Sequence, residues 1–197
     1  MDLVHIYDVA QYNIKTVEKA LRKCNDSVWE EISMMLLTDD FISTFKDKLN
    51  WKLVCRYNQL DETFIDEHKE FVDWKTISHC QNLSELFNAA FKDDLDWKLI
   101  SRYQNLSENF IREFQHLVDR TNILSYQDLS AKFIQDFHDL LDWPSMCIHQ
   151  RLPEHIIRQF SDRVDWNLIS EYQNLCEYFI QEFQDKVNWK LILKNQV

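Results

Sequence analysis

Residues 175–192 read LCEYFIQEFQDKVNWKLI, and this order of leucine, phenylalanine, acid and tryptophan recurs along the chain every 23 residues. The tryptophans of this grid are Trp51, Trp74, Trp97, Trp143, Trp166 and Trp189. Arg120 occupies the one remaining place. Residues 37–197 divide into seven such units without an insertion. A fixed period of this length is typical of stacked repeat proteins.

Each unit begins with a pattern that predicts a short helix. A leucine opens the unit, and apolar residues usually follow four and eight positions later, as in Leu106, Phe110 and Phe114. Steps of four residues place side chains on one face of a helix. A small polar residue in second place predicts an N-cap. The residues concerned are Thr38, Asp61, Ser84, Ser107 and Ser130.

A second helix is predicted to begin at the tryptophan of each unit. Aspartate or asparagine stands directly before it, and both residue types favour the N-cap position. These residues are Asn50, Asp73, Asp96, Asp119, Asp142, Asp165 and Asn188. Further along come an apolar residue and usually a tyrosine, as in Trp97, Ile100 and Tyr103, and we expect the three to form one buried stripe. Pro144 falls in the first turn, where a proline is tolerated.

Helices of two turns are marginal in water by themselves, so the pairs must stack to bury their apolar faces. The sequence therefore predicts an all-α fold, an α-solenoid of seven 23-residue helix–turn–helix repeats over residues 37–197. Residues 1–36 repeat the pattern imperfectly and predict a degenerate N-terminal capping unit. In that unit Asp26, Trp29 and Ile32 correspond to the N-cap, the tryptophan and the isoleucine.

The last repeat carries the full apolar set and is followed by no polar cap. Solenoids normally need a polar final face. Either the end around Trp189 tolerates exposure, or it associates with a second copy of the chain, and both alternatives stay open.

Composition excludes several classes of function. The chain has no glycine, which rules out the phosphate-binding loop, the dinucleotide-binding fingerprint and the nucleophile elbow. The histidines and cysteines show no zinc-site spacing. We therefore expect no metal site, no cofactor and no enzymatic activity.

Charge and cysteine usage indicate the setting. Acids outnumber Lys and Arg by 33 to 22, and the net charge of −11 disfavours wrapping of nucleic acid by the whole molecule. Five cysteines without a CxxC spacing fit reduced thiols in an intracellular compartment. No apolar run approaches the roughly 18 residues that a membrane span requires.

A row of basic residues on the second helices is the candidate binding surface. The residue after the tryptophan and the one four positions later share a helix face. In three consecutive repeats these residues are Lys52 and Arg56, Lys75 and His79, and Lys98 and Arg102. Two interpretations remain open. The lysines pair with acids of their own chain, or the row binds an acidic peptide, a phosphorylated segment or a nucleic-acid backbone.

Arg120 is a second candidate site because it places a charge where the other repeats place a bulky ring. Its long side chain either reaches past the core to water or marks a kink and a local pocket.

Residues 106–119, LSENFIREFQHLVD, and residues 175–192 resemble short helical repeats that occur in many copies in proteins of giant and other large DNA viruses. The resemblance covers all seven repeats, and Arg120 and His68 depart from its pattern. It implies a role in protein contacts inside an infected host cell, in the cytoplasm or the nucleus. The expected function is a non-enzymatic scaffold that binds a protein partner along a helical ridge. The alternative is a viral factor acting on nucleic-acid processes, by binding phosphates at the basic row or by acidic mimicry of DNA.

Overall fold

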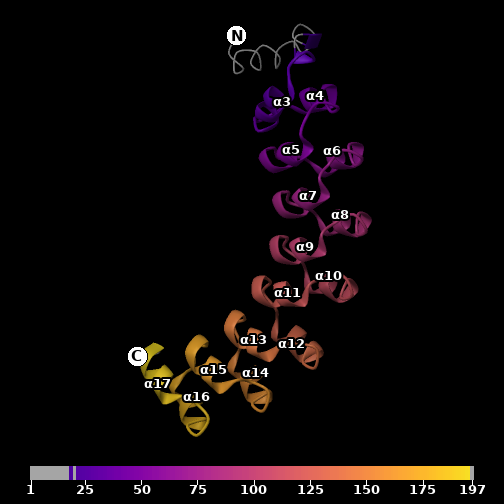
Figure 1. Ribbon diagram of the computed structural model, residues 1–197. Helices are drawn as coiled ribbons and strands as arrows, with labels where there is room; N and C mark the ends of the chain where they lie inside the picture. Colours follow the sequence, from indigo (N-terminus) through magenta and orange to yellow (C-terminus); the bar gives the residue numbers. More distant parts are fainter. Residues whose placement is uncertain (1–17, 20, 196–197) are drawn as a thin grey trace. The chain divides into compact units, whose positions relative to one another are not determined.

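The computed structural model describes residues 18–19 and 21–195, and every regular element in this part of the chain is a helix. The helices alternate in pairs along the chain (Figure 1). The first helices of the repeats are α4 (Asp39–Thr44), α6 (Glu62–Glu67), α8 (Glu85–Ala90), α10 (Glu108–Glu113), α12 (Ala131–Phe137), α14 (Glu154–Gln159) and α16 (Glu177–Glu182). The second helices are α5 (Trp51–Tyr57), α7 (Trp74–Cys80), α9 (Trp97–Tyr103), α11 (Arg120–Tyr126), α13 (Trp143–His149), α15 (Trp166–Tyr172) and α17 (Trp189–Asn195). The predicted α-solenoid of helix pairs is confirmed.

The chain divides into two compact units, Met1–Leu99 and Ile100–Val197, with the boundary inside α9. In the first unit, α5 packs against α7. In the second unit, α13 packs against both α11 and α15, and α15 also packs against α17. Within each unit, therefore, the second helices of consecutive repeats stack on one another.

The N-caps predicted for the seven repeats are confirmed. Before a first helix, the Asp61 carboxylate accepts the Phe64 N–H at 2.7 Å. Before a second helix, the Asp73 carboxylate accepts the Thr76 N–H at 2.8 Å. Capping satisfies donors that the helix itself leaves unpaired, which matters most in helices of six or seven residues. Each repeat thus marks its own helix starts by local chemistry.

The capping unit contains helix α3 (Asp26–Ser33), which packs against α5 as the second helix of a preceding repeat would. The prediction that Asp26 is its N-cap was wrong. Asn25 is the N-cap, and its side chain accepts the Val28 N–H at 3.1 Å. Trp29 is the fourth residue of α3, whereas the tryptophans of the repeats stand first in their second helices. Residues 1–17 and 20 of the predicted capping unit lie outside the described residues.

Rings of neighbouring repeats pack against one another. The indole of Trp74 lies 5.1 Å from the ring of Phe91 in the next repeat, between ring centroids. Further along the chain, the indole of Trp143 lies 4.9 Å from the ring of Phe160. The phenylalanines in fifth place of the repeats are buried at Phe41, Phe64, Phe87, Phe110, Phe133 and Phe179. Stacking of repeats within each unit therefore supplies the core that a single pair lacks.

The tyrosines are not part of the buried stripe, so that prediction was wrong. Their exposed fractions are 44% for Tyr57, 45% for Tyr103, 53% for Tyr126 and 50% for Tyr172. A residue six places after the tryptophan lies about 120° away from it around the helix, whereas the residue four places on lies only about 40° away. That fourth residue is buried instead, and in five repeats it is Cys55, Ser78, Ser101, Cys147 and Ser170.

A buried side-chain amide in each of several repeats ties it to the repeat before. The Nε2 group of Gln150 donates to the carbonyls of Leu124 at 2.6 Å and Gln127 at 2.8 Å. Its Oε1 atom accepts the Leu129 N–H at 3.1 Å. Matching bonds are made by Asn58, Gln81, Gln127 and Gln173. These amides satisfy backbone groups of the loop between repeats, which would otherwise be buried without partners.

A buried hydroxyl makes a second tie between consecutive repeats. Ser170 Oγ donates to the Trp166 carbonyl at 2.6 Å and accepts the Asn188 N–H at 2.9 Å. Cys55 and Cys147 occupy the same place in their repeats. There the sulfur accepts a hydrogen bond from the backbone N–H of the N-cap aspartate of the next repeat, Asp73 for Cys55 and Asp165 for Cys147. The N-cap of one repeat is thereby fixed to the second helix of the repeat before it.

Candidate functional site

The basic face is the set of residues in the first unit formed by Lys52, Arg56, Lys75, His79 and Lys98, and all five side chains are exposed. Helices α5 and α7 carry the first four and contain no acidic residue. Because α5 packs against α7, Lys52 and Lys75 stand at the same place on adjacent helices. The axes of packed helices lie about 8–10 Å apart, so the Cα atoms of Lys52 and Lys75 are expected to be separated by about that distance.

Lys52 and Lys75 form no ion pair with any residue that the structure describes. Lys98 and His79, by contrast, each interact with another residue of the chain. The interpretation that all the lysines of the row are neutralised by their own chain therefore does not apply to Lys52 and Lys75.

Basic residues of several first helices are paired instead. The guanidinium of Arg158 lies 2.6 Å from the Glu182 carboxylate, and their hydrogen bond holds the pKa of Glu182 below its usual value. Lys132 and Arg112 both contact Asp136, at 2.6 and 2.9 Å, and lower its pKa in the same way. Arg112, Lys132 and Arg158 of the first helices are therefore paired with carboxylates, whereas Lys52 and Lys75 of the second helices form no ion pair with a described residue.

Arg102, the sixth residue of the predicted row, belongs to the second unit. Its guanidinium lies 5.2 Å from the ring centroid of Tyr103 and 4.7 Å from that of Tyr126. The three side chains line a surface hollow of about 280 Å³, together with Gln127 and Asp128. Arg102 therefore stacks on aromatic rings, an arrangement that a guanidinium favours.

The grid tryptophans differ in burial. Trp51 and Trp143 are buried, and Trp74, Trp97 and Trp166 are half-buried. The indole N–H of most of them donates to the backbone carbonyl five residues earlier, for example from Trp143 to His138 at 3.1 Å. The bond closes the loop between the two helices of one repeat.

Trp189 is 48% exposed, and it shares the last repeat with Tyr178 at 84% and Leu193 at 65%. Association of this end with a second copy of the chain stays a prediction.

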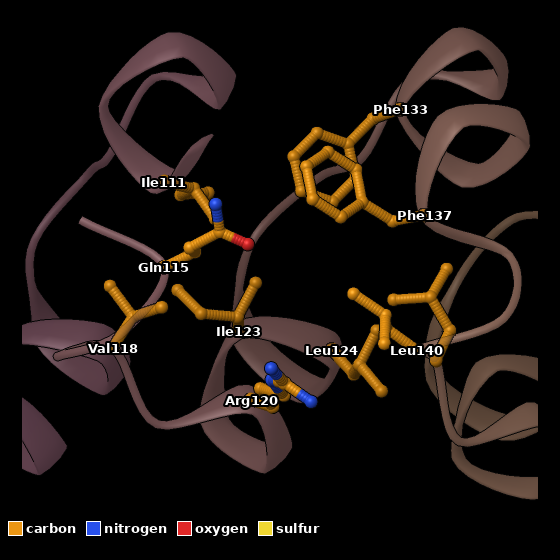
Figure 2. Close-up of a pocket in the computed structure, with 10 residues that line it drawn as sticks. Ile111, Gln115, Val118, Arg120, Ile123, Leu124, Phe133, Phe137 and Leu140 are labelled. Atoms are coloured by element: carbon orange, nitrogen blue, oxygen red, sulfur yellow. The ribbon is translucent and has the colours of Figure 1, made fainter. Parts of the chain in front are cut away.

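Arg120 begins α11, and its side chain is exposed beside a cavity of about 40 Å³ (Figure 2). The cavity lining is almost entirely apolar, with Gln115 and Arg120 as the polar members. The full set is Ile111, Gln115, Val118, Arg120, Ile123, Leu124, Phe133, Phe137, Leu140 and Leu141. All of these residues belong to the second unit.

His68, the other departure from the repeat pattern, is a buried structural residue. Its ring stacks on Phe64 at 4.1 Å between centroids, and Nδ1 lies 3.0 Å from the Phe64 carbonyl oxygen. Its Nε2 atom lies 3.3 Å from Ser43 Oγ. A histidine is accepted in a phenylalanine's place here because both ring nitrogens have polar neighbours.

No cluster of three histidine, cysteine or acidic residues able to hold a metal ion occurs among residues 18–19 and 21–195. Burial raises the pKa of the Cys55 thiol to about 12 and also raises that of Cys147, which keeps both in the unreactive thiol form. None of the described helices has the length and apolar character needed to cross a membrane.

Comparison with known proteins finds no family model, no curated protein and no solved structure that matches the chain.

Proposed function

We propose that this chain is a protein-interaction scaffold and that the basic face of its first unit binds an acidic segment of a partner protein. The observation that carries the proposal is the state of Lys52 and Lys75. Both are exposed, both lie on helices without acids, and neither forms an ion pair with a described residue. In a chain of net charge −11, a local surface of this kind selects an anionic ligand.

The spacing of the basic face favours an extended peptide. Adjacent second helices repeat their lysines about every 8–10 Å. A peptide in the extended polyproline II conformation advances about 3.1 Å per residue and has three residues per turn, so every third side chain lies on the same side. An acidic residue at every third position of such a partner would therefore meet successive lysines. Each such exposed pair contributes little by itself, so recognition depends on several repeats acting together.

The proposed function can be tested by fluorescence anisotropy with a labelled peptide of repeating Glu-Ser-Ser. We expect the paired substitution Lys52→Glu and Lys75→Glu to weaken binding about tenfold or more. The matched control is Lys48→Glu with Lys92→Glu, two exposed loop lysines of the same unit. This control makes the same change in net charge and should weaken binding less than about twofold, because screening limits distant charges. Equal losses in the two variants would contradict a localised site.

A single-stranded DNA oligonucleotide serves as the competing ligand in the same assay. Binding of phosphates weakens steeply as salt rises. If the oligonucleotide binds more tightly than the acidic peptide and loses affinity steeply with salt, the nucleic-acid function replaces the protein-scaffold function.

The resemblance to viral repeats directs the search for the natural partner to infected cells. Cross-linking through a photoreactive residue at position 75 should capture a protein with an acidic segment. Recovery of no specific protein would count against the scaffold.

A further inference from the structure

Other repeats of the second unit place a tryptophan ring at the position that corresponds to the cavity beside Arg120. In the repeat that follows, Trp143 places its indole 4.9 Å from Phe160, a ring of the next repeat. In the repeat after that, Trp166 lies 4.9 Å from Phe183 in the same relation. The residues equivalent to this ring partner and to the preceding phenylalanine of the same helix are Phe137 and Phe133, and both line the cavity. The cavity is thus the place that an indole occupies elsewhere in the molecule.

The hydrogen-bond acceptor for such an indole is also present. The tryptophan N–H of other repeats donates to the carbonyl five residues earlier, as Trp143 does to His138 and Trp166 to Ser161. Counted from Arg120, that carbonyl belongs to Gln115, a lining residue of the cavity. It accepts no hydrogen bond from the described residues.

The charge beside the cavity is unpaired. Arg120 is exposed and forms no ion pair within the described part of the chain. Arg112 does not line the cavity, but its guanidinium lies 4.9 and 4.8 Å from the ring centroids of two lining residues, Phe133 and Phe137. It is already paired with Asp136 at 2.9 Å. An occupant that brings a carboxylate next to its ring would therefore gain a partner in Arg120.

The size of the cavity sets how the ring enters. A cavity of about 40 Å³ is smaller than the roughly 150 Å³ that admits benzene in a closed protein core. Entry of an indole would therefore require the Arg120 side chain, which lines the cavity and is exposed, to move outward. Its guanidinium would then stand at the rim, where a carboxylate of the occupant could meet it.

We propose that the cavity at Arg120 receives a tryptophan side chain of a partner protein, with an aspartate or glutamate beside it in sequence. The proposal rests on the proposed function only in naming a protein as the source of the ring. It uses a different unit of the chain and different chemistry from the basic face. A buried aromatic anchor with a charged neighbour is a common centre of protein recognition.

The first test uses indole-3-acetate and tryptamine, two probes with the same ring and opposite charges, followed by two-dimensional NMR. We expect indole-3-acetate to shift the resonances of Ile123, Leu124 and Phe133, with an affinity roughly three- to fivefold above that of tryptamine. Arg120→Trp should abolish the shifts, because the protein's own indole then fills the cavity. No shift in the wild-type chain, or equal shifts in Arg120→Trp, would overturn the proposal.

A second variant covers the case in which Arg120→Trp fails to fold. Arg120→Gln keeps the cavity and removes the charge. It should retain binding of the indole ring but lose the preference for indole-3-acetate, whereas Arg120→Lys should retain that preference. An undiminished preference in Arg120→Gln would also overturn the proposal. The assay contains no acidic peptide, so its outcome is independent of the basic face.

Discussion

Two consecutive repeats of the second unit differ at the first position of their second helices, where one has Arg120 and the next has Trp143. Trp143 is 7% exposed, contacts the ring of Phe160 and closes its loop through His138. Arg120 does none of this and leaves a cavity. Even so, α11 begins at Arg120 with its N-cap intact, since the Asp119 carboxylate accepts the Asn122 N–H at 2.9 Å.

The comparison shows that helix formation and ring packing are separable in this fold. The N-cap and the buried amide position a repeat whether or not the indole is present, because Gln127 makes the same bonds as its counterparts. The indole adds burial and fills space. A repeat that loses it keeps its backbone and gains a cavity.

The largest change in stability is expected for Trp143→Arg, which gives both repeats an arginine at the first position of the second helix. Trp143→Arg should lower the free energy of unfolding by about 3–5 kcal/mol, the range for removing a large buried ring. Urea unfolding followed by circular dichroism measures the change. Trp189→Arg is the matched control, and its half-exposed ring should cost much less. Similar losses in the two variants would contradict the role assigned to the buried indole.

Removal of the buried amide should come next. Gln150→Leu leaves the Leu129 N–H and the carbonyls of Leu124 and Gln127 without their partner. The free energy of unfolding should fall by about 2–3 kcal/mol, the cost of burying unpaired polar groups. The same urea titration applies. Gln159→Leu removes an exposed side-chain bond to Gln135 and should stay within about 0.5 kcal/mol of wild type.

Asn88 offers a contrast of the same kind in the first unit. Its side chain is fully buried, and neither its amide nitrogen nor its oxygen has a partner among the described residues. The corresponding residue of the preceding repeat is the buried Ile65. Asn88→Ile should raise the free energy of unfolding by about 1–2 kcal/mol, because it removes unpaired buried polar atoms. A loss of stability would show that the amide has a role not visible in the described contacts.

The reverse of the first substitution should produce a smaller gain. Arg120→Trp restores the missing ring and should raise the free energy of unfolding by about 1 kcal/mol, a usual return for filling a cavity. Thr121→Trp, at the next and exposed position of α11, should give no gain in the same unfolding experiment.

The smallest effect at neutral pH is expected for Cys55→Ser, because Ser78 fills the same place in the next repeat. Its free energy of unfolding at pH 7 should stay within about 0.5 kcal/mol of wild type. The difference should appear at alkaline pH. The unfolded thiol ionises near pH 9.0 but the folded one only near 12, so ionisation favours the unfolded state as pH rises from 9 toward 12. Wild type should therefore lose more stability than Cys55→Ser over that range, and parallel curves would contradict the pKa assignment.

The sequence predicted those features that depend on local chemistry. The N-caps at Asp61 and Asp73 and the helix starts follow from residue type and spacing alone, and they are confirmed. The predicted stripe fails at the tyrosines because two steps of three residues carry Tyr103 about 120° round the helix from Trp97, and Tyr103 is exposed. Gln127, Gln150 and Gln173 recur on the 23-residue period, but their burial and their bonds to the repeat before follow from stacking.

Candidate sites were predictable only as positions. Arg120 was conspicuous because a charge replaces a ring, but the cavity depends on how Phe137 and Leu140 of the next repeat pack around it. Likewise, the pairing of Arg112 with Asp136 and the lack of an ion pair at Lys52 depend on neighbours from other repeats. Such contacts arise from stacking, and a single repeat's sequence does not specify them.

The central claim is that the tryptophan ring of each repeat packs against a phenylalanine of the next repeat. A crystal structure of the Arg120→Trp variant tests it most directly. The repeat geometry predicts that the new indole N–H donates to the Gln115 carbonyl and that its ring lies about 5 Å from Phe137, within the usual range for aromatic pairs. An indole turned toward solvent, with the cavity still empty, would contradict the claim.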